Sequence, residues 1–78
     1  MVLADLKPGD QATIKRFAEG IKSHPAYRQK LLAMGLTPNT SIQMIRKAPL
    51  GDPIEIQVRN YYLSLRSREA IYIIVEKT

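Results

Sequence analysis

Four short segments in the second half of the chain alternate apolar and polar residues, and this alternation restricts the fold more than any other feature. The segments span residues 40–48, 53–58, 61–65 and 70–76. Successive side chains of a β-strand point to opposite faces of a sheet, so a period of two predicts strands. Residues 11–17, in which Ala12 and Ile14 alternate with polar residues, follow the same pattern. The sequence therefore predicts five short strands.

Arg59 and Asn60 separate two of these strands and predict a two-residue hairpin loop. Directly opposed residues share one face of a sheet. Asn60 tolerates the positive φ that such a loop needs. We expect one apolar face directed inward, because this register opposes six apolar residues: Val58 and Tyr61, Ile56 and Leu63, Ile54 and Leu65.

Residues 23–38 carry the clearest helical pattern. Tyr27, Leu31 and Met34 fall on one face of a helix, and Gly35 stands where a left-handed residue can end it. A single helical turn is expected at residues 67–70, before the last strand, with Ser67 as its cap.

The 78 residues suffice for one small domain, residues 1–78, with a thin core. The chain has no cysteine, so no disulfide reinforces it. Five short strands with one helix inserted after the first and a helical turn before the last predict a mostly β, partly open barrel.

Enzymatic and metal chemistry find no support in the sequence. His24 is the only histidine, no nucleophile stands near a base, and no glycine-rich phosphate loop is present. The carboxylates never recur at helical spacing, so we expect no catalytic residue, no cofactor and no intrinsic metal site.

The ends and hydropathy of the chain favour a cytoplasmic protein. No apolar run approaches the roughly 20 residues that span a bilayer, so we expect no direct membrane insertion. The first ten residues lack the basic-then-apolar order of a secretory signal.

Twelve Lys and Arg residues against seven Asp and Glu give a net charge of +5. Nucleic acid, an acidic protein partner, an anionic membrane surface or simple solubility would each explain this charge. Nucleic acid is the less favoured partner, because the chain has no Trp and few aromatic residues for stacking. The basic residues that would serve it are Arg46, Lys47, Arg59, Arg66 and Arg68.

Residues 48–53, Ala-Pro-Leu-Gly-Asp-Pro, exclude regular structure and yet hold an apolar residue, Leu50. Leu50 either folds back to plug one end of a thin barrel or projects outward as an anchor. Pro49 and Pro53 stiffen the loop and Gly51 allows a tight turn, and a rigid loop loses little entropy on binding. Outward projection would suit recognition of a partner.

These patterns together resemble the FeoA family, a small component of bacterial ferrous iron uptake. The resemblance rests on Leu3, Leu6 and Gly9, on Leu31–Gly35 with Leu36 and Pro38, on Arg46–Val58, and on Leu63–Ala70. Asn39 and Asn60 stand where the family commonly has glycine.

The resemblance implies an SH3-like barrel and a partner, a membrane ferrous iron permease with a cytoplasmic GTP-hydrolysing domain. It also implies an association with transition metal ions. The same domain is similar to the C-terminal module of iron-dependent repressors, so a transcription-linked, nucleic-acid-binding role is the alternative.

We therefore expect a non-enzymatic accessory protein that works through protein–protein contacts, with a homo-oligomer left open. Leu31 lies on the Tyr27–Met34 face and is more a core candidate than a contact, whereas Leu32, on the adjoining face, is as much one as the other. Arg46, Lys47 and Arg66 are candidates for steering an acidic partner. The predicted contact residues are Pro49, Leu50, Gly51, Asp52, Pro53, Leu31, Leu32, Arg46, Lys47 and Arg66.

Overall fold

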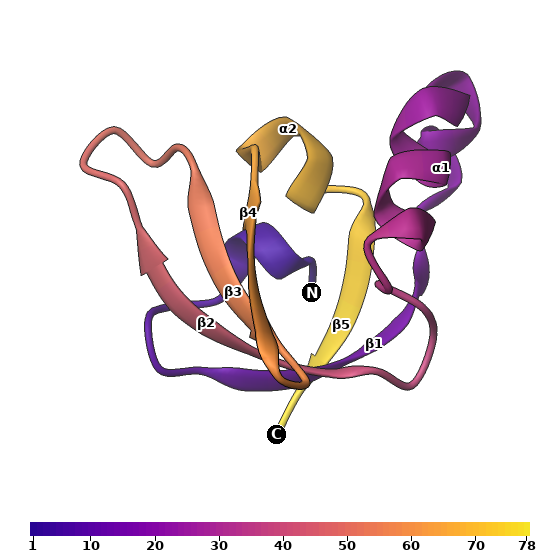
Figure 1. Cartoon of the computed structure of the whole chain (residues 1–78). Helices are drawn as coiled ribbons and strands as arrows, with labels where there is room; N and C mark the ends of the chain where they lie inside the picture. The colour runs from indigo at the N-terminus through magenta and orange to yellow at the C-terminus, as the bar shows by residue number, and fades with distance from the viewer.

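The computed structural model describes all 78 residues, and its main feature is a strongly curved antiparallel sheet (Figure 1). The strand order is β4-β3-β2-β1-β5, and the two edge strands do not pair with each other. The predicted partly open, mostly β barrel is therefore confirmed. The elements are η1 (Leu3–Asp5), β1 (Gln11–Phe17), η2 (Glu19–Ser23), α1 (Pro25–Ala33), β2 (Ser41–Lys47), β3 (Ile54–Val58), β4 (Tyr61–Leu65), α2 (Ser67–Ala70) and β5 (Ile73–Lys77).

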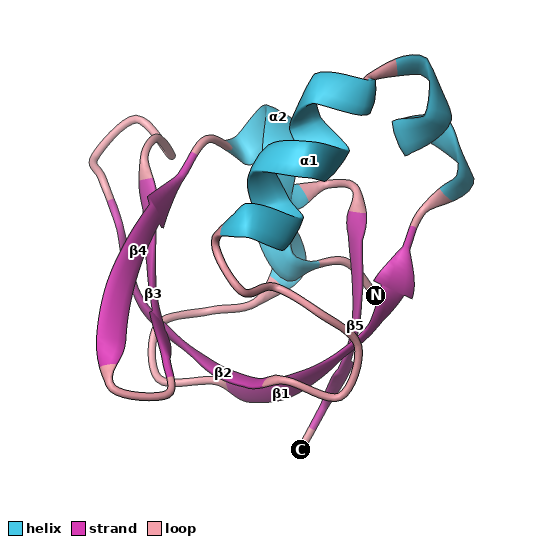
Figure 2. Ribbon diagram, turned by 45° about the vertical axis from the view of Figure 1, so that its right-hand side comes forward, coloured by secondary structure: helices cyan, strands magenta, loops and turns pink.

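The sheet forms a trough whose open side carries the helices (Figures 1 and 2). The short helix α2 lies over the gap between β4 and β5, and the loop between β2 and β3 projects at the same end. The hairpin loop between β3 and β4 lies at the opposite end, near the C-terminus. The trough thus has two different ends, and the 48–53 loop and α2 share one of them.

The core fills the trough with apolar side chains from every part of the chain. Residues of β3 alternate between buried and half-buried, as a half-covered strand requires. Leu3, the first residue of η1, and Leu6, which directly follows η1, are both fully buried in the core. The other members of this cluster are Ala12, Ile14, Ile21, Leu31, Leu36, Ile42, Met44, Ile54, Ile56, Val58, Leu65, Ala70, Ile73 and Val75.

The predicted register of the β3–β4 hairpin is confirmed by the pairing of Ile54 with Leu65, Ile56 with Leu63 and Val58 with Tyr61. Two details of the predicted hairpin were wrong: the residue with the positive φ and the burial of the six opposed residues. Arg59, with φ of 52°, takes the positive φ instead of Asn60, because mirror-image hairpin turns always need it at the first loop position.

The six opposed residues of the hairpin are also not all buried. Leu63 is half-buried, and Tyr61 keeps 37% of its surface exposed. Tyr61 stays partly exposed because its Oη donates a hydrogen bond to the carbonyl oxygen of Met34, 2.6 Å away, which holds the ring at the rim of the core.

Helix α1 is shorter than the predicted 23–38, and Gly35 ends it as expected, with φ of 87°. The N–H of Leu36 donates to the Leu31 carbonyl at 3.1 Å, and the N–H of Gly35 donates to the Leu32 carbonyl at 3.0 Å. This pair of hydrogen bonds is the Schellman motif, which satisfies the last carbonyls of a helix. Leu31 and Leu36 are both fully buried beneath it.

Candidate partner-binding surface

Leu50 projects into solvent from the loop between β2 and β3. Its side chain is 98% exposed, more than any other large apolar residue of the chain. The alternative in which Leu50 plugs the barrel is therefore wrong, because Ile54, Ile56 and Leu65 fill that part of the core without it.

Hydrogen bonds fix the shape of this loop. The N–H of Gly51 donates to the Ala48 carbonyl at 2.7 Å and closes a tight turn around Pro49 and Leu50. The N–H of Ala48 in turn donates to the Pro53 carbonyl at 3.0 Å. Gly51 has φ of 86°, a conformation that glycine adopts without strain. The loop therefore presents Leu50 on a defined backbone.

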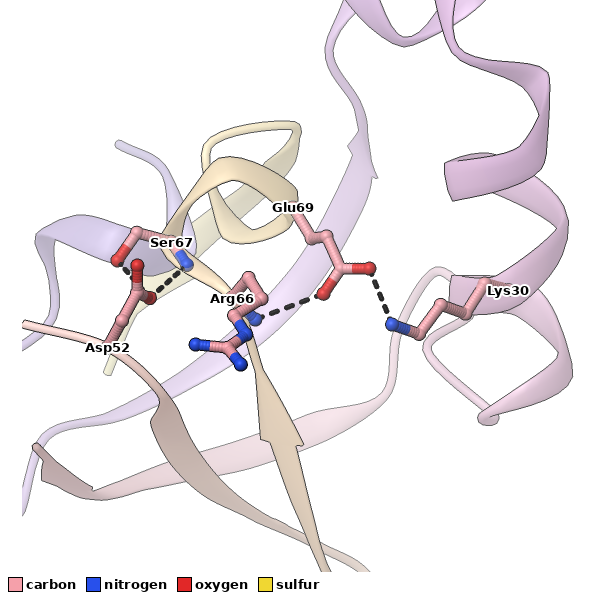
Figure 3. A network of polar contacts seen from close by, with 5 residues as sticks. All are labelled: Lys30, Asp52, Arg66, Ser67 and Glu69. Carbon is pink, nitrogen blue, oxygen red and sulfur yellow. Dashed lines mark hydrogen bonds and ion pairs between the residues drawn. The ribbon is translucent and has the colours of Figure 1, made fainter.

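Asp52 attaches the loop to α2 (Figure 3). The N–H of Ser67 donates to Asp52 Oδ1 at 2.6 Å. Ser67 Oγ lies 2.8 Å from the same oxygen and 3.0 Å from the Gly51 carbonyl oxygen, so its hydrogen is shared between them. The expectation that Ser67 caps α2 was wrong: Ser67 is the first helical residue, and the carboxylate of Asp52 caps its N–H.

The Asp52 carboxylate is held in its charged form by these contacts. The backbone N–H of Ser67 and then its hydroxyl lower the pKa of Asp52, and the charges of Arg66 and Arg68 lower it further. Asp52, predicted as a contact residue, thus also attaches the loop to α2 through Oδ1.

Glu69 carries a second attachment, between α2 and α1 (Figure 3). Its side chain is only 4% exposed, and Lys30 Nζ donates to its Oε2 at 2.7 Å. The N–H of Arg66 donates to Oε1 at 3.0 Å. Burial acts to raise the pKa of Glu69, but the hydrogen bonds from Lys30 and Arg66 and the Lys30 charge outweigh it and lower that pKa. Helix α2 therefore holds both the Leu50 loop and α1.

The structure places the remaining predicted contact residues differently. Leu31 is fully buried beneath α1, as its favoured core role predicted, and its role as a candidate contact is not supported. Lys47 is half-buried and its Nζ donates to the Ala4 carbonyl at 2.8 Å. Arg46 is exposed, with its Nε 3.6 Å from Glu55 Oε1. Leu32 is half-buried and Arg66 is exposed.

Two residues of this surface were not assigned from the sequence as partner contacts. Ser67 bridges the loop and α2 through contacts 15 residues apart along the chain, which no local pattern indicates. Arg68 follows it and is exposed; only its basic character was visible in the sequence.

The surface holds no arrangement that indicates catalysis or metal binding. No three His, Asp or Glu side chains of the structure lie close enough together to hold a metal ion. A shallow polar groove of about 580 Å³ lies near the other end of the trough, with Arg59 as its one charged side chain. None of the helices is long and apolar enough to span a membrane.

A sequence profile of the FeoA domain matches residues 1–77. The chain belongs to the FeoA family. This family is an accessory iron transport family with an SH3-like fold, and its role is in ferrous iron transport.

Among relatives, an Fe(2+) transport protein A/Fe(2+) transporter FeoB fusion protein of Porphyromonas gingivalis is 36% identical over 76 residues. The match covers 97% of this chain but 8% of that fusion protein. In that relative, an FeoA-like segment and FeoB thus occupy one polypeptide.

Solved FeoA structures share the fold. FeoA of Chlorobium tepidum is 38% identical with a TM-score of 0.84, over 97% of this chain and 69% of that one. FeoA of Stenotrophomonas maltophilia, an SH3 domain protein solved in complex with zinc, is 25% identical with a TM-score of 0.83, over 97% and 89%. The predicted SH3-like barrel is confirmed.

A manganese-dependent transcriptional repressor also contains this fold. The TM-score is 0.87 over 99% of this chain and 40% of the repressor, at 17% identity. At that identity the likeness concerns the fold alone.

Proposed function

We propose that this chain is a non-enzymatic accessory protein of ferrous iron uptake that binds the cytoplasmic part of an FeoB-type permease, which includes the GTPase domain. The fusion of Fe(2+) transport protein A with FeoB in the Porphyromonas gingivalis relative is the observation that carries the proposal. Fusion into one polypeptide holds two domains at high effective concentration, and this arrangement suits partners that work in contact.

Leu50 is the proposed anchor of this contact. A leucine that is 98% exposed contributes nothing to the core, and burial in a partner would gain about 1.5–3 kcal/mol. The loop is already ordered by the Gly51–Ala48 and Asp52–Ser67 hydrogen bonds, so little conformational entropy is lost on binding.

A binding assay tests this function. The full chain is titrated against the purified cytoplasmic domains of the permease and against the full-length permease in detergent, at low salt. We expect binding that Leu50→Asp weakens at least tenfold, which corresponds to about 1.4 kcal/mol. The matched control is Tyr62→Asp, which changes a 60%-exposed apolar residue of β4 and leaves binding intact. Absence of binding to both permease preparations would refute the proposal.

The nucleic-acid alternative has less support. Of the basic residues it would use, Arg46 lies beside Glu55 and Lys47 is bound to the Ala4 carbonyl. It predicts a mobility shift with duplex or single-stranded DNA that weakens steeply with salt. A shift at about 50 mM salt, where phosphate contacts are strong, together with no permease binding would favour this alternative.

A further inference from the structure

We infer that the Leu50 loop and α2 form one docking unit, and that this unit fits an apolar pocket rimmed by carboxylates on the partner. The inference rests on the proposed function, and it adds the chemistry of the partner's surface and the residue that holds the two parts of the unit together. We call Leu50, Arg66, Ser67 and Arg68 the docking unit.

The apolar part is a single protruding side chain. Leu50 stands at the tip of a hydrogen-bonded turn, and its neighbours Pro49 and Asp52 are exposed as well. A single exposed side chain on a fixed turn fits a concave site better than a flat one, as anchor residues of protein interfaces do.

The charged part comes from Arg66, directly before α2, and from Arg68 within it. Arg66 and Arg68 are exposed and flank Ser67, the residue that touches the loop. The ion pairs of this structure use Lys22, Lys30, Arg46 and Lys77, so neither arginine has a carboxylate partner within its own chain. Both are direct neighbours of Ser67, whose N–H and hydroxyl bind Asp52 and Gly51 of the loop, and this attachment holds the arginines on the loop side of α2.

The positive charge of Arg66 and Arg68 indicates which groups the partner's surface must carry. Asp52 Oδ1 already accepts hydrogen bonds from the N–H and hydroxyl of Ser67, and neither arginine forms an ion pair with this carboxylate. Guanidinium groups pair with carboxylates through two parallel hydrogen bonds. A partner with carboxylates around an apolar pocket would supply the missing acceptors. A second copy of this chain would bring arginines together and is disfavoured.

Ser67 is the positioning residue of the docking unit. Its backbone N–H and hydroxyl bind Asp52, and its hydroxyl also reaches Gly51, the residue next to Leu50. Removal of the hydroxyl leaves one of these contacts, the N–H bond to Asp52. The loop would then lose its fixed relation to Arg66 and Arg68.

The test measures permease binding for Arg66→Gln/Arg68→Gln and for Lys15→Gln/Arg16→Gln. The second pair is exposed on β1 and removes the same charge. We expect the first pair to weaken binding about tenfold or more and to reduce its salt dependence, and the second to change binding less than threefold. Equal effects of the two pairs would overturn the acidic-rim assignment.

The role of Ser67 is tested through Leu50. Ser67→Ala is expected to weaken binding about three- to tenfold, and Ser67→Thr, which keeps a hydroxyl, to restore it. In a Leu50→Ala background Ser67→Ala should have little further effect, because it acts by positioning Leu50. Additive effects of the two changes would overturn this role.

Hydrogen exchange in the free protein separates this inference from the proposed function. Ser67→Ala should speed exchange of the Gly51 amide, which bonds to Ala48, without changing exchange in β1 or β5. Unchanged Gly51 exchange would overturn the role of Ser67 whether or not the permease binds. Sedimentation with phosphatidylglycerol vesicles that depends on Leu50 and both arginines, without permease binding, would replace the protein partner with a lipid surface.

Discussion

Lys30 Nζ on α1 lies 2.7 Å from Glu69 Oε2 on α2, and this ion pair joins two residues that are 39 positions apart in the sequence. Its two members differ in environment, since the Lys30 side chain is 52% exposed and that of Glu69 is 4% exposed. The Lys30 charge thus offsets the cost of removing the Glu69 carboxylate from water.

Lys30→Met should destabilise the fold by about 1–3 kcal/mol, because it leaves the buried Glu69 carboxylate with only the Arg66 N–H as a donor. The matched control is Lys22→Met, which breaks the exposed Lys22–Glu19 pair and should cost less than about 1 kcal/mol. Urea unfolding of both variants measures the difference. Equal stability of the two would show that the Lys30–Glu69 pair contributes no more than a surface pair.

The stability of the fold should fall in acid in part through Glu69. The pKa of Glu69 in the folded protein lies below its ordinary value of 4.5, so the unfolded chain takes up a proton at higher pH than the folded one. The resulting stabilisation is complete above pH 4.5 and is lost as pH falls through the lowered pKa. Glu69→Gln should therefore flatten the acid limb of stability against pH, whereas Glu76→Gln, at an exposed residue without an ion pair, should flatten it less. An acid limb unaltered by Glu69→Gln would contradict this.

Gly35→Ala should cost more than Gly51→Ala, although both glycines have nearly the same φ, 87° and 86°. Each change introduces about 1–2 kcal/mol of backbone strain. At Gly35 the new Cβ would also clash with Tyr61 Oη, whereas a Cβ at Gly51 would meet no neighbouring atom. Thermal unfolding measures the difference, and the penalty at Gly35 should be smaller in a Tyr61→Phe background. A larger penalty at Gly51 would contradict the packing of Tyr61 against Gly35.

Leu50→Asp should leave stability within about 0.5 kcal/mol of the original chain, because the side chain has no contact to lose. Ile56→Asp is the counterpart, since Ile56 is fully buried on β3 and a carboxylate there should unfold the protein. Circular dichroism and denaturant titration compare them. Unfolding by Leu50→Asp would show that the loop folds back onto the barrel.

The strands and the pairing of β3 with β4 could be predicted from the sequence because their signals are local. The register of β3 and β4 follows from apolar alternation and a two-residue loop, and the end of α1 follows from Gly35. The last strand starts at Ile73 rather than residue 70, because Ala70 belongs to α2 and a turn follows it.

The candidate site could be predicted only in part, because its contacts are not local. The same Ala-Pro-Leu-Gly-Asp-Pro sequence suits a loop that folds inward and one that projects, so only the tertiary structure decided the place of Leu50. The cap that Asp52 provides for Ser67, and the burial of Glu69 against Lys30, depend on where α2 lies over the trough. The partner contacts themselves remain predictions.

The pairing of β1 with β5 has a consequence for the order of folding. Ile73 pairs with Phe17, 56 positions earlier, whereas Tyr61 pairs with Val58 across a two-residue turn. A hairpin of that kind closes within about 1–10 μs, while pairing across most of the chain waits on a large loop closure. During synthesis β1 must therefore leave the ribosome long before its edge partner exists. We therefore expect the pairing of β1 with β5 to form after the β3–β4 hairpin.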